Sequence, residues 1–251
     1  MHQPTPYDIN FNFYGFPIRI NPLFWVVITL LGMPREITNL SVALLELAIW
    51  VLAAFVSILV HELGHALVFR HVYRVPSQII FYGMGGATIP FMPHQRRYGF
   101  KGLLYEIFLF AAGPLAGFVL AGCFSVPALF IFLAINRDGQ FFFNEGLGVA
   151  GLSVLIIIAS FMQMVIIISI LWGIFNLLPI YPMDGGHISR EIFSFFSFRN
   201  GVANSLILSM ITAIIFALLA FRFGQPFMAI LFAYFAYQNY QELSYGSFRR
   251  W

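Results

Sequence analysis

Two histidines and a glutamate near residue 60 are the residues of this chain best suited to metal chemistry. The segment His61-Glu62-Leu63-Gly64-His65 has the pattern H-E-x-x-H. On a helix, this spacing places both imidazoles on one face as ligands of one zinc ion, with Glu62 beside them as a general base. Zinc lowers the pKa of a bound water to about 7, and a carboxylate can then accept its proton. The pattern therefore predicts a hydrolytic zinc site.

A third ligand is expected, because a catalytic zinc takes three protein ligands and keeps one position open for water. Asp184 is the candidate, since Pro179 and Pro182 interrupt the apolar helix before it. Gly185 and Gly186 follow it and permit backbone conformations that other residues avoid. We therefore expect one zinc ion per chain, bound by His61, His65 and Asp184.

Asn176, eight positions before Asp184, is the second candidate catalytic residue beside Glu62. Its amide is a hydrogen-bond donor that can stabilise a tetrahedral oxyanion or hold the backbone of a substrate. Two further polar residues near these segments, Glu106 and His187, have no role that the sequence defines.

The composition indicates what kind of structure must position these residues. Of the 251 residues, 60% are hydrophobic and 9% are charged, whereas about a quarter are charged in an average soluble domain. We therefore predict an all-α polytopic membrane protein. Six apolar segments are expected to form its transmembrane helices, at about 22–34, 41–69, 103–135, 149–178, 202–221 and 225–240. The histidine motif lies within the second segment, and ionisable residues inside a membrane indicate function.

The lysines and arginines define an orientation for these helices. If the N-terminus is cytoplasmic, ten of the thirteen basic residues lie on the cytoplasmic side, as the positive-inside rule favours. Both termini are then cytoplasmic. His61 and His65 lie near the cytoplasmic end of their helix, and the fourth segment also runs towards that side. We therefore expect Asp184 at the same depth as the histidines.

The paired motifs resemble the site-2 protease family of intramembrane zinc metalloproteases. The family's signatures are H-E-x-x-H and N-x-x-P-x-x-x-x-D-G, and here the second reads Asn176-Leu177-Leu178-Pro179-Ile180-Tyr181-Pro182-Met183-Asp184-Gly185. The resemblance implies one domain over residues 1–251. Many relatives carry a PDZ or CBS domain, but the short loops and the 11 residues after residue 240 leave no room for either, so we expect the compact form. It also implies a catalytic core of three helices at about 41–69, 103–135 and 149–178. The compact six-helix form suggests a prokaryotic plasma membrane.

A β-element is expected between the second and third helices. Short apolar runs around glycines at about 78–92 suggest a hairpin, which resembles the re-entrant β-element of the family. An exposed edge strand can hold an extended peptide through backbone hydrogen bonds. The expected substrates are transmembrane proteins or signal-peptide-like fragments, as in regulated intramembrane proteolysis. The lipid bilayer is the other expected partner, and no nucleic acid is.

Three alternatives stay open at this stage. A membrane metalloprotease of another type would take a glutamate as third ligand, either Glu106 or Glu145, although neither lies in an E-x-x-x-D pattern. A catalytically silent protein that binds membrane segments would not need Glu62. A transporter can contain broken helices with buried polar groups, but it gives no reason for the H-E-x-x-H spacing.

Overall fold

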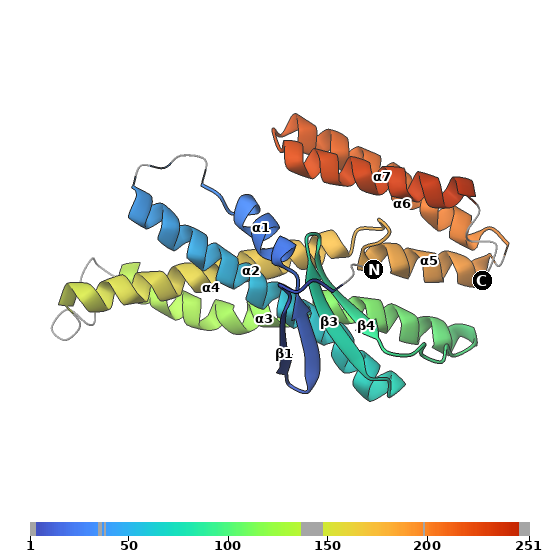
Figure 1. Ribbon diagram of the computed structural model, residues 1–251, viewed down its shortest axis with the longest axis horizontal. Helices are drawn as coiled ribbons and strands as arrows, with labels where there is room; N and C mark the ends of the chain where they lie inside the picture. Colours follow the sequence, from blue (N-terminus) through green and yellow to red (C-terminus); the bar gives the residue numbers. More distant parts are fainter. Residues whose placement is uncertain (1–3, 35–36, 38, 137–147, 198, 246–251) are drawn as a thin grey trace. The chain divides into compact units, whose positions relative to one another are not determined.

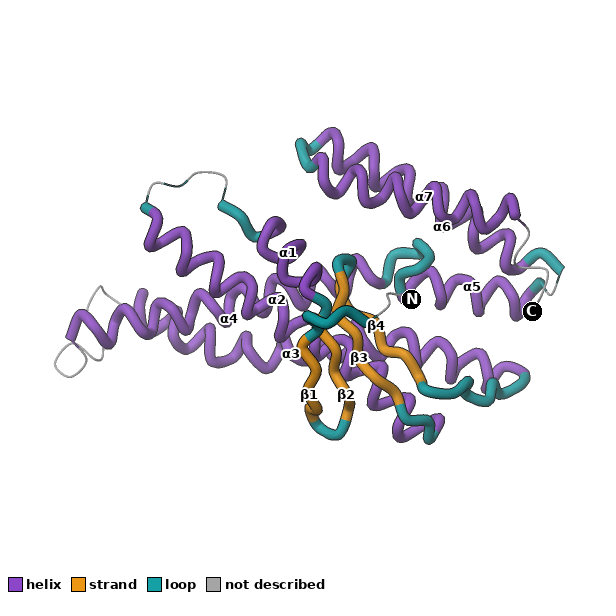
Figure 2. Tube along the Cα trace, viewed as in Figure 1, coloured by secondary structure: helices purple, strands orange, loops and turns teal. Residues whose placement is uncertain are grey.

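The computed structural model describes residues 4–34, 37, 39–136, 148–197 and 199–245, which are mostly helical and include one small β-sheet (Figures 1 and 2). The α-helices are α1 (Pro22–Leu31), α2 (Leu40–Val68), α3 (Gly99–Asn136), α4 (Gly148–Asn176), α5 (Asp184–Phe196), α6 (Gly201–Arg222) and α7 (Pro226–Tyr245). A π-helical turn, η1 (Phe69–Tyr73), continues α2. The strands are β1 (Ile9–Phe13), β2 (Phe16–Ile20), β3 (Ser77–Tyr82) and β4 (Gly85–Pro90).

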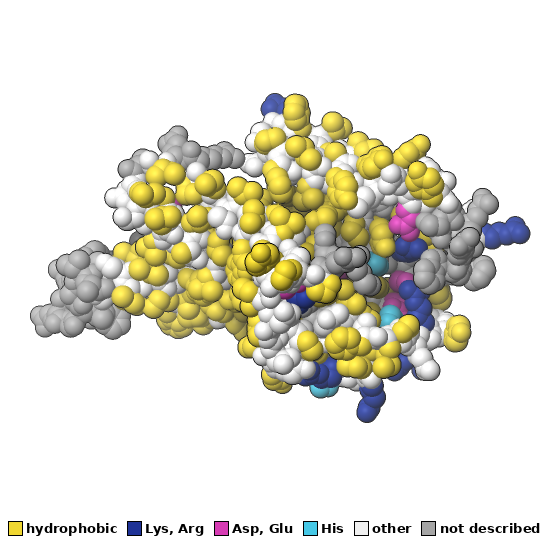
Figure 3. Space-filling model, in the orientation of Figure 1, with side chains coloured by type: hydrophobic (Ala, Val, Ile, Leu, Met, Phe, Trp, Pro, Cys, Tyr) yellow, Lys and Arg dark blue, Asp and Glu magenta, His cyan; other side chains and the backbone are white. Residues whose placement is uncertain are grey.

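Four helical segments are long and apolar enough to cross a membrane: Leu40–Tyr73, Gly99–Leu133, Ser153–Asn176 and Gly201–Arg222. Many of their large hydrophobic side chains are exposed, and yellow side chains dominate the visible helix surfaces in Figure 3. Such surfaces suit contact with lipid. The first expected segment forms only the 10-residue helix α1, about 15 Å long, and α7 has a more polar second half. The count of six crossings therefore stays a prediction.

The chain forms two compact units. The first comprises Met1–His94 and Leu115–Gly173, and the second comprises Gln95–Pro114 and Ile174–Trp251. Helices α3 and α4 each contribute residues to both units. The assignment of residues 1–251 to a single domain stays a prediction.

The first unit contains a four-stranded sheet with the order β1-β2-β3-β4. The pairs β1–β2 and β3–β4 are antiparallel, whereas β2 and β3 are parallel, with Ile18 opposite Ile79. The hairpin expected at about 78–92 is present as β3 and β4. Strands β1 and β2 were not predicted from the sequence. Tyr14 and Gly15 make the tight turn between them with positive φ angles of 50° and 75°, as a two-residue hairpin turn of type I′ requires.

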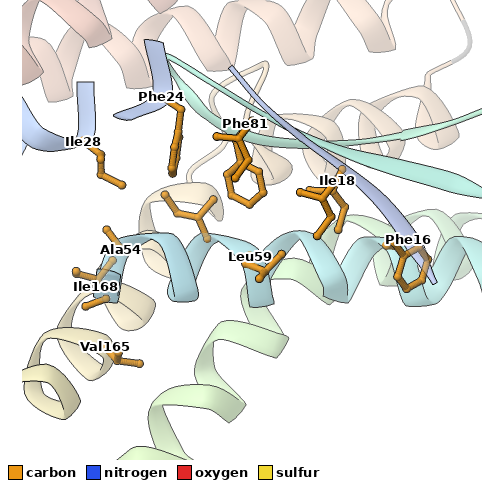
Figure 4. Close-up of a cluster of buried hydrophobic side chains, with 14 residues drawn as sticks. Phe16, Ile18, Phe24, Ile28, Ala54, Leu59, Phe81, Val165 and Ile168 are labelled. Atoms are coloured by element: carbon orange, nitrogen blue, oxygen red, sulfur yellow. The ribbon is translucent and has the colours of Figure 1, made fainter. Parts of the chain in front are cut away.

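The core of the first unit lies between this sheet and α2 (Figure 4). Phe16, Phe24 and Phe81 are each at most 2% exposed, and burial of one such side chain stabilises the fold by about 1.5–3 kcal/mol. Helix α2 begins where the Asn39 side chain accepts hydrogen bonds from the N–H groups of Ser41 and Val42. The cluster of buried side chains joins the sheet to α2 and includes Leu59 and Ala66, which flank the histidine motif.

The second unit has its own core, in which Ile180 packs with side chains of α6 and α7. The turn between α4 and α5 is tied to these helices through the backbone of Tyr181. Its N–H donates to Ser209 Oγ over 3.1 Å, and its carbonyl accepts from Asn239 Nδ2 over 2.7 Å. Helix α5 was not predicted from the sequence, because its first residues follow two prolines and include two glycines. The two hydrogen bonds of Tyr181 hold the turn between α4 and α5 against α6 and α7.

Candidate metal centre

The two histidines of the H-E-x-x-H motif lie one turn apart on α2, as the spacing predicted. Their side chains are buried, with residue exposures of 3% for His61 and 7% for His65. The two Nε2 atoms are 3.3 Å apart, and the rings meet edge to face at 74°. Two polar rings are thus directed to the same point inside the first unit.

The separation of the histidine nitrogens fits a shared metal ion. Zinc binds imidazole nitrogen at about 2.0–2.1 Å in a tetrahedral arrangement, which places two such nitrogens about 3.3–3.4 Å apart. The 3.3 Å between the Nε2 atoms of His61 and His65 agrees with this value. The pair therefore satisfies the requirement of two ligands for one zinc ion.

Glu62 is held beside the histidines by strand β4. The carboxylate is 4% exposed, and its Oε2 atom lies 2.8 Å from the hydroxyl of Thr88. That hydroxyl is also 2.9 Å from the Glu62 carbonyl oxygen. A Cβ atom at Gly86 would lie 2.5 Å from Glu62 Cγ, so only glycine leaves room for this carboxylate. Burial raises the pKa of the neighbouring Tyr82, and the charge of Glu62 raises it further.

Helix α4 closes the site from another direction within the first unit. The indole of Trp172 lies 6.5 Å from the His61 ring, centroid to centroid. Gly85 has a φ of +123°, and a Cβ atom there would lie 2.8 Å from Trp172. One turn before His61, Ser57 accepts a 3.0 Å hydrogen bond from Ser169 of α4. These contacts fix how α2 is rotated about its axis relative to α4, and hence which way the side chains of the H-E-x-x-H motif point.

The residues of the second signature lie in the second unit. Asn176 is the last residue of α4, and Asp184 is the first residue of α5; both are partly buried. Asp184 thus lies on a helical first turn, where the sequence analysis expected only an irregular helix end. The roles of Asn176 and Asp184 stay predictions.

The two glycines after Asp184 serve a purpose other than the expected one. Neither has a positive φ. Instead, a Cβ atom at Gly185 would collide with the carbonyl oxygens of Leu177 and Leu178, and one at Gly186 with the backbone of Tyr181. The expectation of unusual backbone conformations was therefore wrong, and the glycines allow α5 to begin directly against the end of α4.

The structure gives partial information on the residues without a defined role. His187 stacks on Phe110 with ring centroids 4.4 Å apart and meets Tyr181 edge to face. Glu106 is buried at 3% exposure. Glu145, one of the alternative ligands, lies outside the described residues. His187 is therefore part of an aromatic cluster in the second unit.

The comparison with protein families decides the classification. The model of peptidase family M50 matches residues 49–221, well over half of the chain and including both signatures. The chain belongs to peptidase family M50. This membership and the four apolar helices indicate an integral membrane protein, and the family relationship implies zinc.

This M50 chain is similar to two proteins from Methanocaldococcus jannaschii. The zinc metalloprotease MJ0392 is 27% identical over 185 residues, which are 73% of this chain but only 44% of that protein. The chain thus spans less than half the length of this relative. The solved structure of a site-2 protease matches with a TM-score of 0.56 and 23% identity, covering 94% of this chain and 95% of the other. The M50 chain therefore has the site-2 protease fold.

The residues that orient Glu62 were not predicted from the sequence. Thr88 and Gly86 belong to the hairpin that was predicted, but their contacts depend on the register that places Thr88 opposite Ile79. The pair Gly85-Gly86 was the available signal, because adjacent glycines within a strand often mark a close approach of another group.

Proposed function

We propose that this chain is a zinc-dependent intramembrane endopeptidase that hydrolyses peptide bonds in or near transmembrane segments. The observation that carries the proposal is the arrangement on α2. The Nε2 atoms of the buried His61 and His65 lie 3.3 Å apart. The buried carboxylate of Glu62 is held beside them by a hydrogen bond from Thr88 of β4. Membership of peptidase family M50 supports hydrolysis of a peptide bond as the reaction.

The proposed ligands of a single zinc ion are His61, His65 and Asp184, each of which offers one ligand atom. Bound zinc would supply Lewis acidity towards a carbonyl oxygen and lower the pKa of water. Asp184 is favoured because it stands at the aspartate of the second family signature. Its position on the first turn of α5 gives it a defined backbone.

Glu62 acts as the general base in this proposal. Its carboxylate accepts the proton of the attacking water and passes it to the leaving amine. The hydroxyl of Thr88 holds Oε2, so the carboxylate keeps one orientation through the reaction. Asn176 donates a hydrogen bond to the oxyanion that develops on the scissile carbonyl, or holds the adjacent peptide.

Strand β4 is the proposed docking edge for the substrate. It is an edge strand, since β3 is its neighbour in the sheet order and no further described strand follows it. A helical substrate hides its carbonyls in internal hydrogen bonds, so the segment must unwind before cleavage. An extended segment alongside β4 would pass next to Glu62, which contacts Gly86 and Thr88 of this strand.

The proposed orientation places the site near the cytoplasmic end of α2, with both termini in the cytoplasm. It rests on the distribution of basic residues, ten of thirteen on one side. The substrates proposed are membrane proteins or signal-peptide-like remnants in a prokaryotic plasma membrane.

The first test compares two identical changes on α2. We expect E62Q to lower cleavage of a transmembrane reporter peptide at least about 100-fold, as loss of a general base does, while bound zinc stays near one per chain. The control is E46Q, which alters an exposed glutamate on the same helix and should leave cleavage unchanged. Cleavage is followed by mass spectrometry and zinc by elemental analysis. Equal cleavage by E62Q and wild type would exclude Glu62 as the general base, and a wild-type chain that does not cleave the reporter would support a silent binding protein instead.

The second test separates the two assignments of the third ligand. We expect D184N to lower the zinc content of the purified chain, because a zinc site with two ligands binds weakly. E106Q should keep the metal, although Glu106 is buried at 3% exposure. If E106Q loses zinc and D184N keeps it, the third ligand is Glu106. If both variants keep zinc, the third ligand is neither Asp184 nor Glu106.

A further inference from the structure

A second polar site lies in the first unit, at the junction of the β1–β2 turn with the end of α2. It is a cavity of about 490 Å³, within the range of about 300–1,000 Å³ common for small-molecule sites. Its lining consists of Gly15, Phe16, Pro17, Arg70, Arg74, Val75, Pro76, Ser77 and Phe91. This lining contains two arginines and no carboxylate, so the cavity favours an anion.

Arg70 is a fixed part of the cavity wall. Its two terminal nitrogens donate to the carbonyl oxygens of Tyr14 and Gly15 over 2.9 and 2.8 Å. Its guanidinium carbon lies 3.5 Å from the centre of the buried Phe16 ring. A guanidinium has five N–H groups, so these two bonds leave donors available to a ligand. The charge of Arg70 is therefore held in place before any ligand arrives.

Arg74 lines the same cavity from a backbone position that normally favours glycine. It ends η1 with a φ of +56°, in the left-handed region that residues with a side chain rarely adopt. Its guanidinium makes no hydrogen bond or ion pair within the described part of the chain. A strained backbone that presents a charged side chain to a cavity points to a role for that side chain.

Ser77 supplies the observation that is independent of charge. The residue is 2% exposed and lines the cavity, and its hydroxyl makes no hydrogen bond among the described residues. A buried hydroxyl without a partner costs free energy, so native structures usually satisfy it. A ligand oxygen in the cavity would accept the bond that Ser77 can donate.

We propose that this cavity binds a phosphate group, held by Arg70, Arg74 and the hydroxyl of Ser77. Arginine matches the planar, two-oxygen face of a phosphate through paired charge-assisted hydrogen bonds. A serine hydroxyl adds a neutral donor that a simple cluster of surface cations lacks. The phosphate comes from an anionic phospholipid headgroup or from a free phosphate ion. The cavity lies directly after the apolar segment Leu40–Tyr73, which is long enough to cross a membrane, and a headgroup would meet the chain at the end of such a segment.

The test measures binding to the purified full-length chain in neutral detergent, with thermal unfolding at matched ionic strength. The probes are short-chain phosphatidylglycerol and inorganic phosphate, titrated separately against wild type and four variants. We expect R74Q to weaken binding roughly 10- to 100-fold and S77A several-fold, as loss of a charged and a neutral hydrogen bond does. R74K should recover part of the loss. R222Q, which alters an exposed arginine at the end of α6, is the charge-matched control and should bind as wild type.

Each outcome decides the proposal. Dependence on Arg74 and Ser77 with phosphatidylglycerol supports it and identifies a lipid headgroup as the source. The same dependence with inorganic phosphate alone supports it with a free ion as the source. If R74Q and S77A bind both probes as tightly as R222Q, or if the wild-type chain binds neither, the proposal is overturned. The result is independent of proteolytic activity, because no residue of this cavity belongs to the proposed catalytic set.

Discussion

The two halves of the family signature are built in different ways. On α2, His61 and His65 are positioned by the repeat of a regular helix, and Glu62 is fixed by side-chain contacts with the neighbouring strand β4. At the junction of α4 and α5, Asp184 is positioned by a tight turn whose backbone atoms touch each other at Gly185 and Gly186. The geometry of the half on α2 therefore depends on side-chain contacts, and the geometry of the half at the α4–α5 junction depends on backbone packing.

This difference teaches where each half tolerates change. A side chain that meets a new methyl group can avoid it by rotating about its own bonds, but it then loses its original orientation. A backbone carbonyl cannot move without rearranging the turn. We therefore expect replacements near Glu62 to affect catalysis more than stability, and replacements near Asp184 to affect stability first.

The largest effect is expected for G185A, because its methyl group would meet the carbonyl oxygens of Leu177 and Leu178. Overpacking against backbone should destabilise the second unit by about 3 kcal/mol or more, visible as a large fall in the melting temperature. G122A is the matched control, since a Cβ atom at Gly122 on α3 meets nothing within 4 Å. A G185A chain as stable as G122A would contradict the assignment of the glycine to backbone packing.

The second effect concerns G86A, whose methyl group would lie 2.5 Å from Glu62 Cγ. We expect displacement of the carboxylate to lower kcat about 100-fold, or about 2.7 kcal/mol, with a smaller loss of stability than in G185A. Activity assays and thermal unfolding on the same samples separate the two effects. If G86A instead unfolded like G185A and lost no activity per folded molecule, the contrast between the two halves would fail.

The smallest effect is expected for T88V, which removes the hydroxyl that holds Glu62 Oε2. A hydrogen bond to a charged group contributes about 1.5–3 kcal/mol. We expect the lower end of this range, because the hydroxyl also lies near the Glu62 carbonyl oxygen, so kcat should fall roughly 10-fold with little change in KM. T88S retains the hydroxyl and should restore most of the rate. Equal rates for T88V and T88S would show that Thr88 acts only through packing.

The helical half of the site was predictable, because its information is local. The spacing of His61 and His65 determines their common face once a helix is assumed, and the apolar run around them makes the helix evident. The Asn176 to Asp184 spacing was recognisable as a family signature. The expected hairpin was also found, since its strands lie next to each other in sequence.

The remaining features depend on contacts between distant segments or on backbone geometry. Helix α5 was missed because the prolines before it and the glycines in its first turn usually indicate a loop. In this chain the glycines instead allow the backbone of α5 to pack against the end of α4. The support of Glu62 by Thr88 follows from the register of β4, which no pattern in the sequence defines. Strand β2 was missed because its partner β3, which pairs with residues 18–20, lies about sixty residues further along the chain. Strand β1 pairs with β2 and was missed with it.

The parallel pairing of β2 with β3 has a consequence for folding. Both hairpins close short turns, but the contact between Ile18 and Ile79 joins positions about sixty residues apart, and such long-range contacts form slowly. The segment from Glu62 to Thr88 is much shorter, so the carboxylate can meet its strand without waiting for the N-terminal hairpin. We therefore expect the contact of Glu62 with β4 to form before the pairing of β2 with β3, which attaches the beginning of the chain.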